Sequence, residues 1–192
     1  MAYLDGLQEY LNENYEISVF DTALEAGNPW EIHVHGDGTL KGRVLENHKW
    51  DLILATGDGQ QEVQKIQIAF LYPADLAERI GPLLGTDKEV QAMGLEPILA
   101  PGKRRFVKNK SLFPLMKERE VLFFTLLEGQ VIRGVVTGFS RYDITVHLKG
   151  ALPVTVLRHA IYDVRNKKGR SFLKSFQEKH RDWEKSPLYI DE

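Results

Sequence analysis

The stretch Val121–Val164 reads VLFFTLLEGQVIRGVVTGFSRYDITVHLKGALPVTVLRHAIYDV, and it decides the fold. In its clearest segment, residues 141–150, apolar and polar side chains alternate. The side chains expected on one face are Tyr142, Ile144, Val146 and Leu148, and those expected on the other are Asp143, Thr145, His147 and Lys149. A period of two residues predicts a half-buried β-strand.

Turn and bend signals divide the same stretch into short strands. Glu128-Gly129 lies between two apolar runs and predicts a tight hairpin turn. Gly134 and Gly138 lie inside strand-like sequence, where glycine usually marks a bend or a bulge. Together these signals predict a small, strongly bent antiparallel barrel.

The two motifs of this stretch resemble those of the Hfq family of bacterial Sm-like (LSm) RNA-binding proteins. The first is matched from Leu127-Glu128-Gly129 through Gly134 to Phe139-Ser140-Arg141-Tyr142, and the second by Arg158-His159-Ala160-Ile161. A short helix expected around Leu112–Met116 stands where the family has its opening helix. The resemblance covers roughly residues 108–166.

The resemblance implies a site for single-stranded RNA. In the family, an aromatic side chain of the first motif stacks on a base, and a basic residue and a histidine of the second motif contact base and phosphate. The residues that match these roles are Tyr142 as the stacking ring, Arg141 beside it, Arg158 and His159 as polar partners, and Lys117 and Arg119 as rim cations. Aromatic rings, guanidinium groups and imidazoles suit these tasks chemically. The alternative interpretation is that Tyr142 fills one end of the barrel and His159 makes a structural hydrogen bond.

The first half of the chain repeats this pattern. Leu40–Val44 corresponds to Ile132–Val136, and Trp50–Leu54 corresponds to Tyr142–Val146. Lys65-Ile66-Gln67-Ile68 falls on the second motif with a slip of one residue. We therefore predict a mainly β protein with two five-stranded antiparallel Sm-like barrels in tandem, each preceded by a short helix. The alternative is a chance likeness between two bent sheets.

The repeat also places a stacking position in the first half. That position is Trp50, with Lys49 and Lys65 nearby, but Ile66 replaces the histidine. Because the surrounding sequence is acidic, we interpret Trp50 as structural, and we expect Trp50→Ala to impair folding more than binding.

Composition shifts and turn signals give the domain boundaries. We predict a degenerate Sm-like domain over residues 1–75, a linker over 76–107, an Hfq-like domain over 108–166 and a basic tail over 167–192. Within these regions the helical patterns are Ala2–Asn12, Asp75–Leu84, Asp87–Met93 and Ser171–Glu184, and the segment Ile17–Phe20 is strand-like.

Charge is distributed unevenly along the chain, although the formal net charge is only −2. Residues 1–102 hold 6 Lys and Arg against 17 Asp and Glu, a net of −11, whereas residues 103–192 hold 19 against 10, a net of +9. Such an asymmetry indicates a half that binds a polyanion. The basic half is also the half that resembles the Hfq family.

Several functional classes are disfavoured by what the sequence lacks. The chain has no cysteine, so disulfides, thiolate metal sites and cysteine nucleophiles are excluded. It has no apolar run long enough to cross a bilayer and no signal-peptide pattern, so we expect a cytoplasmic protein. His33, His35 and Asp37 have a spacing that suits a divalent ion, but we interpret the histidines as exposed strand residues and predict no metal and no cofactor. No catalytic motif is evident, and we predict no enzymatic activity.

The favoured function is therefore a non-catalytic RNA-binding protein, either an RNA chaperone or a post-transcriptional regulator. The alternative is an assembly scaffold that has kept the fold and lost base recognition. We also expect a homo-oligomeric ring, because barrels of this kind expose strand edges that neighbours can pair. The acidic N-terminal half or the C-terminal helix could bind a protein partner.

Overall fold

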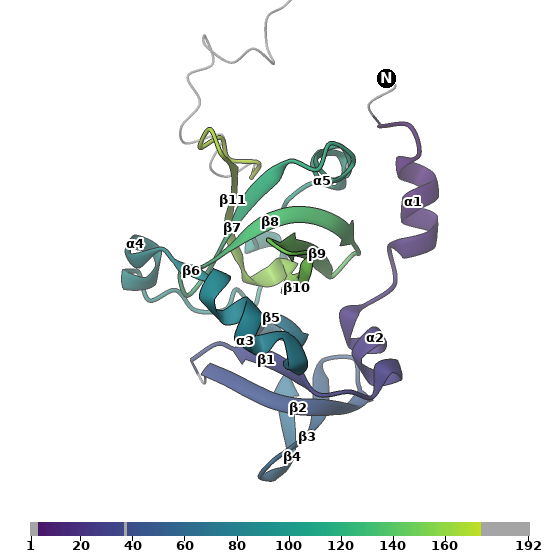
Figure 1. Ribbon diagram of the computed structural model, residues 1–192, viewed down its shortest axis with the longest axis vertical. Coiled ribbons are helices and arrows are strands. Elements are labelled where there is room, and N and C mark those ends of the chain that lie inside the picture. Colours follow the sequence, from purple (N-terminus) through teal and green to yellow (C-terminus); the bar gives the residue numbers. More distant parts are fainter. Residues whose placement is uncertain (1–3, 37, 174–192) are drawn as a thin grey trace, which may run out of the picture.

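The computed structural model describes residues 4–36 and 38–173, and β-strands dominate it (Figure 1). The strands are β1 (Trp30–Val34), β2 (Gly38–Asn47), β3 (Asp51–Thr56), β4 (Gly59–Gln64), β5 (Ile68–Pro73), β6 (Gly85–Thr86), β7 (Val121–Leu126), β8 (Gln130–Phe139), β9 (Asp143–Leu148), β10 (Leu152–Leu157) and β11 (Ile161–Asn166). The α-helices are α1 (Leu7–Asn14), α2 (Val19–Ala26), α3 (Ala77–Ile80), α4 (Lys88–Ala92) and α5 (Asn109–Lys117). None of these described helices has the length and apolar character needed to cross a membrane.

The strands form one continuous antiparallel sheet, so the prediction of two separate five-stranded barrels is wrong. Among the described residues, the sheet has 11 strands in the order β11-β7-β8-β9-β10-β5-β1-β2-β3-β4, with β6 beside β8. The two halves join where Thr155 and Val156 of β10 pair with Leu71 and Phe70 of β5. Two separate barrels would leave β10 and β5 as exposed edges, and pairing them satisfies backbone groups that would otherwise need another partner.

The two halves of this sheet share one pattern of strand pairing. Gly42 of β2 lies opposite Trp30 of β1, as Gly134 of β8 lies opposite Leu122 of β7. The next strand pairs also agree, because each shifts its register directly after the same matched valine. These shifts fall between Val44 and Glu46 in the first half and between Val136 and Gly138 in the second. The predicted bulge at Gly138 is confirmed, and it has a counterpart in β2.

Residues 17–20 were expected to be strand-like, but they enter helix α2. Ser18 is the N-cap: its hydroxyl accepts the backbone N–H of Phe20 at 3.2 Å, and the Asp21 carboxylate accepts the Ser18 N–H at 3.4 Å. This reciprocal cap stabilises the first turn of a helix. A left-handed Gly27, with φ of 64°, ends the helix. The local capping chemistry therefore outweighs the β preference of the apolar run.

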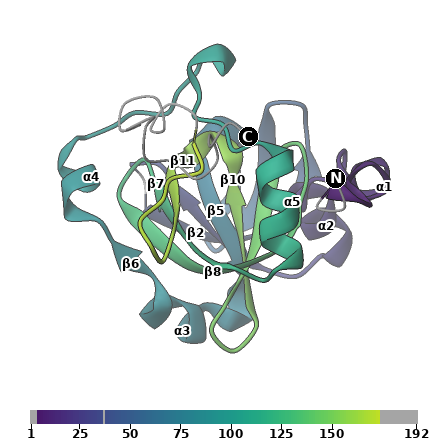
Figure 2. The same cartoon turned by 90° about the horizontal axis from the view of Figure 1, so that it is seen from above.

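The apolar core has two parts that meet at the β10–β5 pair. One part fills the second half and includes buried residues of β5, such as Phe70 and Tyr72. The other fills the first half and includes Leu71 of β5 together with Leu157 of β10. Helix α2 packs on β2 and helix α5 packs on β8 (Figures 1 and 2).

Other predicted helices are present in shorter form. Helix α1 corresponds to the predicted opening helix, of which residues 2 and 3 lie outside the described range, and α3 and α4 fall within the two predicted linker helices. The predicted C-terminal helix lies outside the described residues, except for residues 171–173, which are not helical.

Candidate nucleic-acid interface

A groove of about 640 Å³ lies between the two halves of the sheet. We call it the inter-half groove. It is formed by the N-terminus of α2, the β2–β3 turn, the 3₁₀ turn η2 (Lys65–Gln67), the β8–β9 turn, the end of β10 and the linker. Its lining residues are Glu16, Ser18, Phe20, Asp21, Asn47, Lys49, Trp50, Asp51, Gln64, Lys65, Ile66, Arg104, Tyr142, Leu157 and His159.

Two exposed aromatic side chains line this groove from opposite halves. Trp50 is 70% exposed and Tyr142 is 45% exposed. Each immediately precedes a strand, β3 or β9, and each is held by the same backbone contact. The Trp50 carbonyl accepts the N–H of Lys65 at 2.8 Å, and the Tyr142 carbonyl accepts the N–H of Arg158 at 2.9 Å. The repeated pairing pattern therefore brings two equivalent aromatic positions to one groove.

A buried polar turn fixes the position of Tyr142. The Ser140 hydroxyl accepts the backbone N–H of Tyr142 at 3.1 Å and donates to the Asp143 carboxylate at 2.9 Å. The other oxygen of Asp143 accepts the N–H of Val19, at the start of α2, at 2.9 Å. Burial raises the pKa of Asp143, and the hydrogen bonds from Val19 and Ser140 partly offset this effect. These contacts hold the ring on a rigid support, which lowers the entropic cost of stacking a ligand.

Arg158 does not reach the inter-half groove, although the motif implied a phosphate contact. Its guanidinium is buried, where it donates to the Val107 carbonyl at 3.0 Å and to the Asn109 side chain at 2.9 Å. The rings of Phe106 and Phe139 lie 5.7 and 5.6 Å from the guanidinium carbon. Burial lowers the pKa of Arg158 to about 10. This arginine therefore ties the linker to the second half of the sheet.

His159 lines the groove but also joins the two halves. Its Nε2 atom is 2.8 Å from the carbonyl oxygen of Ile68, the first residue of β5. Burial lowers the pKa of His159 to about 4, the hydrogen bond to Ile68 opposes this shift, and nearby Arg104 lowers the pKa further. The ring is therefore neutral at neutral pH, and Nε2 carries the proton that the carbonyl accepts.

The remaining predicted residues lie beside the groove or away from it. Arg141 neighbours Tyr142, with its guanidinium carbon 5.8 Å from the ring and a guanidinium nitrogen 3.9 Å from the Glu16 carboxylate. Lys117, at the end of α5, donates to the Asp5 carbonyl at 3.3 Å. Arg119 follows that helix in a left-handed conformation. Of the six predicted residues, Tyr142 and His159 line the groove and Arg141 adjoins it.

Three cations of the groove were not predicted as RNA ligands. The Lys49 ammonium lies 5.0 Å from the Trp50 ring. The Lys65 ammonium contacts the His48 carbonyl, and burial lowers its pKa. Arg104, from the basic linker, donates to the carbonyls of the nearby linker residues 98 and 99. The repeat itself contained the signal for the first two, since Lys49 and Lys65 match Arg141 and Arg158.

The charge of the groove is balanced. The carboxylates of Glu16, Asp21 and Asp51 line it together with the three cations. Carboxylates accept hydrogen bonds from the amino groups of bases, and ammonium and guanidinium groups bind phosphates. With two exposed rings, the groove can therefore bind a ligand that consists of flat rings with polar edges, joined by few phosphates.

The sequence matches no protein-family model and no curated protein. The resemblance to the Hfq family therefore stays a prediction from the motifs.

The histidines weighed as metal ligands have separate surroundings. His33 stacks on Phe70 with ring centroids 3.9 Å apart, and its Nε2 lies 3.1 Å from the Tyr72 hydroxyl. Burial lowers the pKa of His33 to about 4. His35 lies 3.4 Å from Glu96 and 3.7 Å from Glu128. Within residues 4–36 and 38–173, no group of three or more histidine, aspartate or glutamate side chains is arranged to hold a metal ion.

Proposed function

We propose that this protein is a non-catalytic RNA-binding protein that holds single-stranded RNA in the inter-half groove, as an RNA chaperone or a post-transcriptional regulator would. The single observation that carries this proposal is the placement of Trp50 and Tyr142. Two large aromatic rings remain exposed at equivalent positions of the repeat, and both line one groove. Exposed rings on a rigid support are the usual platforms on which unpaired bases stack.

The cations of the groove support the same function. Lys49 lies next to the Trp50 ring, and Arg104 brings the basic linker to the groove. Each can neutralise a phosphate of a strand whose bases stack on the rings. The uneven charge of the chain adds support, because residues 103–192 carry a net charge of +9.

One observation favours the scaffold alternative. The Arg158 guanidinium and the Nε2 of His159, which the resemblance assigns to RNA, are both hydrogen bonded within the protein. A protein that has lost base recognition can keep these residues for structure alone. The two functions differ in what the groove binds, so one titration separates them.

The experiment measures the binding of a fluorescent single-stranded RNA to the full chain and to Trp50→Ala and Tyr142→Ala. Loss of one base–aromatic stack costs about 1–3 kcal/mol, so each variant is expected to weaken binding roughly tenfold or more. The matched control is Phe123→Ala, which removes a partly exposed ring on β7 that does not line the groove. This control should bind RNA like the unmodified chain.

The opposite result would favour the scaffold. If both groove variants keep their melting temperature and bind RNA as tightly as the control, the rings are not stacking platforms. If the unmodified chain shows no RNA binding at all, the proposed function fails as a whole.

A further inference from the structure

The sheet ends in two strands with different surroundings. At one end, β4 has β3 as its neighbour, and no second strand of the described chain pairs with it. Its side chains are exposed, with the exception of Val63. A strand of this kind presents unpaired N–H and C=O groups to any strand of suitable sequence.

At the other end, the chain covers its own edge. After β11 the chain turns back at Gly169, and residues 170–173, which we call the edge cap, run antiparallel to β11. The backbone N–H of Phe172 donates to the carbonyl of Val164 at 2.9 Å, and the N–H of Asn166 donates to the carbonyl of Arg170 at 3.1 Å. The edge cap therefore takes the hydrogen-bonding positions that a further strand would use.

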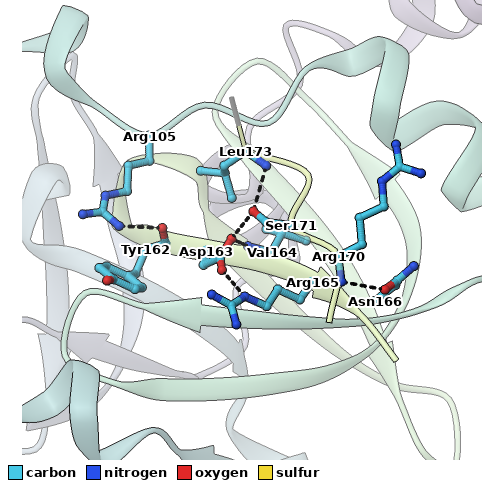
Figure 3. A network of polar contacts seen from close by, with 9 residues as sticks. All are labelled: Arg105, Tyr162, Asp163, Val164, Arg165, Asn166, Arg170, Ser171 and Leu173. Carbon is cyan, nitrogen blue, oxygen red and sulfur yellow. Dashed lines mark hydrogen bonds and ion pairs between the residues drawn. The ribbon is translucent and has the colours of Figure 1, made fainter. Parts of the chain in front are cut away.

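Side chains fix the edge cap in place (Figure 3). The Ser171 hydroxyl donates to the Asp163 carboxylate at 2.5 Å and accepts the N–H of Leu173 at 3.2 Å. The Leu173 side chain is fully buried in the core of the second half. From the linker, Arg105 donates to the Tyr162 carbonyl at 3.0 Å. The β11 edge is thus closed at residues 162, 164 and 166.

The molecule contains an internal example of how such edges pair. Thr155 of β10 lies opposite Leu71 of β5. Glu62 pairs with a residue of β3, and Thr155 pairs with a residue of β9. These two partners occupy equivalent positions of the repeat, so Glu62 on β4 is equivalent to Thr155 on β10. By the same comparison of partners, on β7 and β1, Val164 on β11 is equivalent to Leu71 on β5. The equivalent contact between two molecules would place Glu62 opposite Val164.

We propose that β4 of one molecule and β11 of a second copy are complementary edges, and that the edge cap keeps this head-to-tail contact closed. Val164, whose carbonyl the cap occupies, is the residue that the repeat places at the centre of the contact. The open β4 edge and the capped β11 edge cannot pair while the cap is bound. Release of the cap makes the chain self-complementary, and the contact can then propagate from one copy to the next. The ring expected from the sequence requires this release.

The test compares the full chain with Phe172→Pro, which removes the N–H that donates to Val164. Light scattering should give the mass of one chain for the unmodified protein at micromolar concentration. The variant should show a mass that rises with concentration, because its β11 edge is open.

A matched pair of variants tests the register of the contact. The repeat places Gln61 of β4 opposite Arg165 of β11, and the Gln61 side chain is exposed within the monomer. In the Phe172→Pro background, Gln61→Glu should associate more tightly than Gln61→Lys, by roughly twofold to tenfold in dissociation constant, since opposite charges across a strand pair attract and like charges repel. Equal association of the two would overturn the proposed register.

Ser171→Ala provides a second route if the proline variant loses its fold. It removes the contacts with Asp163 and Leu173 N–H while leaving the backbone donor in place, so it should associate more weakly than Phe172→Pro. The proposal is overturned if either folded cap variant stays monomeric, or if the unmodified chain already associates as strongly as the variants. None of these outcomes depends on RNA binding.

Discussion

Lys65 and Arg158 hold the same place in the two halves, and each donates its backbone N–H to an exposed aromatic residue. Their side chains nevertheless differ in function. The Lys65 ammonium lines the inter-half groove, whereas the Arg158 guanidinium is buried between the linker and the sheet. Motif spacing identified both positions along the chain. It could not give the direction of a long side chain, which depends on neighbours such as Val107 that are remote in sequence.

The first prediction concerns folding. Arg158→Ala leaves the buried Val107 carbonyl and the Asn109 side chain without their donor, and we expect the free energy of unfolding to fall by about 2–4 kcal/mol. Trp50→Ala removes a ring that is mostly exposed, so its effect should be under about 1 kcal/mol. This order reverses the expectation from the sequence, in which Trp50 was structural. Urea denaturation of both variants measures it, with Arg158→Lys as an intermediate case because lysine keeps the charge without the forked donors.

The second prediction concerns pH. The pKa of His159 is about 4 in the folded protein and 6.5 ordinarily. Between these values the unfolded chain binds a proton that the folded chain does not, so stability is fully present above about pH 6.5 and is lost as the pH falls towards 4. A shift of this size corresponds to a loss on the order of 3 kcal/mol. His33 has a similar shift and should add a comparable loss.

His159→Gln tests this assignment. Its amide can still donate to the Ile68 carbonyl, but it does not titrate in this range. The variant should lose about half as much stability between pH 7 and pH 4.5 as the unmodified chain, because His33 still titrates. Denaturant titrations at several pH values provide the measurement, and an unchanged pH dependence would argue against a buried, neutral His159.

Strand β8 shows why the elements need particular residues. A β-carbon added to Gly134 would lie 2.3 Å from the His147 carbonyl oxygen, and one added to Gly42 would lie 2.9 Å from the Ala55 carbonyl oxygen. At both places two neighbouring strands approach too closely for any side chain. Gly138, in the same strand as Gly134, has its nearest neighbour at 3.6 Å, the Tyr10 hydroxyl.

The third prediction uses this difference. Gly134→Ala must push two strand backbones apart, and we expect it to destabilise the protein by about 2–3 kcal/mol or more. Gly138→Ala, the matched control, should change stability by less than about 1 kcal/mol, since its added methyl makes an ordinary contact. Thermal unfolding followed by circular dichroism compares them. Equal losses of stability in the two variants would show that the strands can move apart at residue 134 at little cost in free energy.

Alternation predicted strand β9 well, and its exceptions have a physical cause. Ile144, Val146 and Leu148 are buried as expected. Tyr142 and Asp143 exchange the expected roles, since the tyrosine is exposed and the aspartate is buried. The strand begins only at Asp143, whose carboxylate accepts the N–H of a residue 124 positions earlier in the chain. A local period in the sequence contains no information about so distant a partner.

At the scale of the whole molecule, the sequence could not give the relation between the halves. Each half was predicted to close on itself, because periodicity and turns describe strands but not the partner of an edge. The pairing of β10 with β5 makes one sheet and also creates the inter-half groove. The site was therefore predicted in part: Tyr142 and His159 are in it, and the cations from the first half and the linker were missed.

The fourth prediction concerns salt. Three cations line the groove, so RNA bound there should show a slope of log affinity against log salt no steeper than about −2, at roughly 0.7 per neutralised phosphate. Lys49→Ala should reduce this slope, because Lys49 lies in the groove. Lys117→Ala, on α5, should leave the slope unchanged. A slope much steeper than this, reduced by Lys117→Ala, would move the phosphate contacts to the α5 rim.

The N-terminal helices dock on sequence that the ribosome makes much later. The Tyr10 hydroxyl of α1 donates to the Phe139 carbonyl at 2.9 Å, and the start of α2 is held by Asp143. At about 5–20 residues per second, these helices wait roughly ten seconds for their partners. During that interval their apolar faces are exposed, while the strands β1 to β5 can already pair with one another. We expect proteases to cut α1 in nascent chains stalled before β9 and to spare it in chains stalled after the second half has emerged, so translation speed sets how long the unfinished protein is open to chaperones.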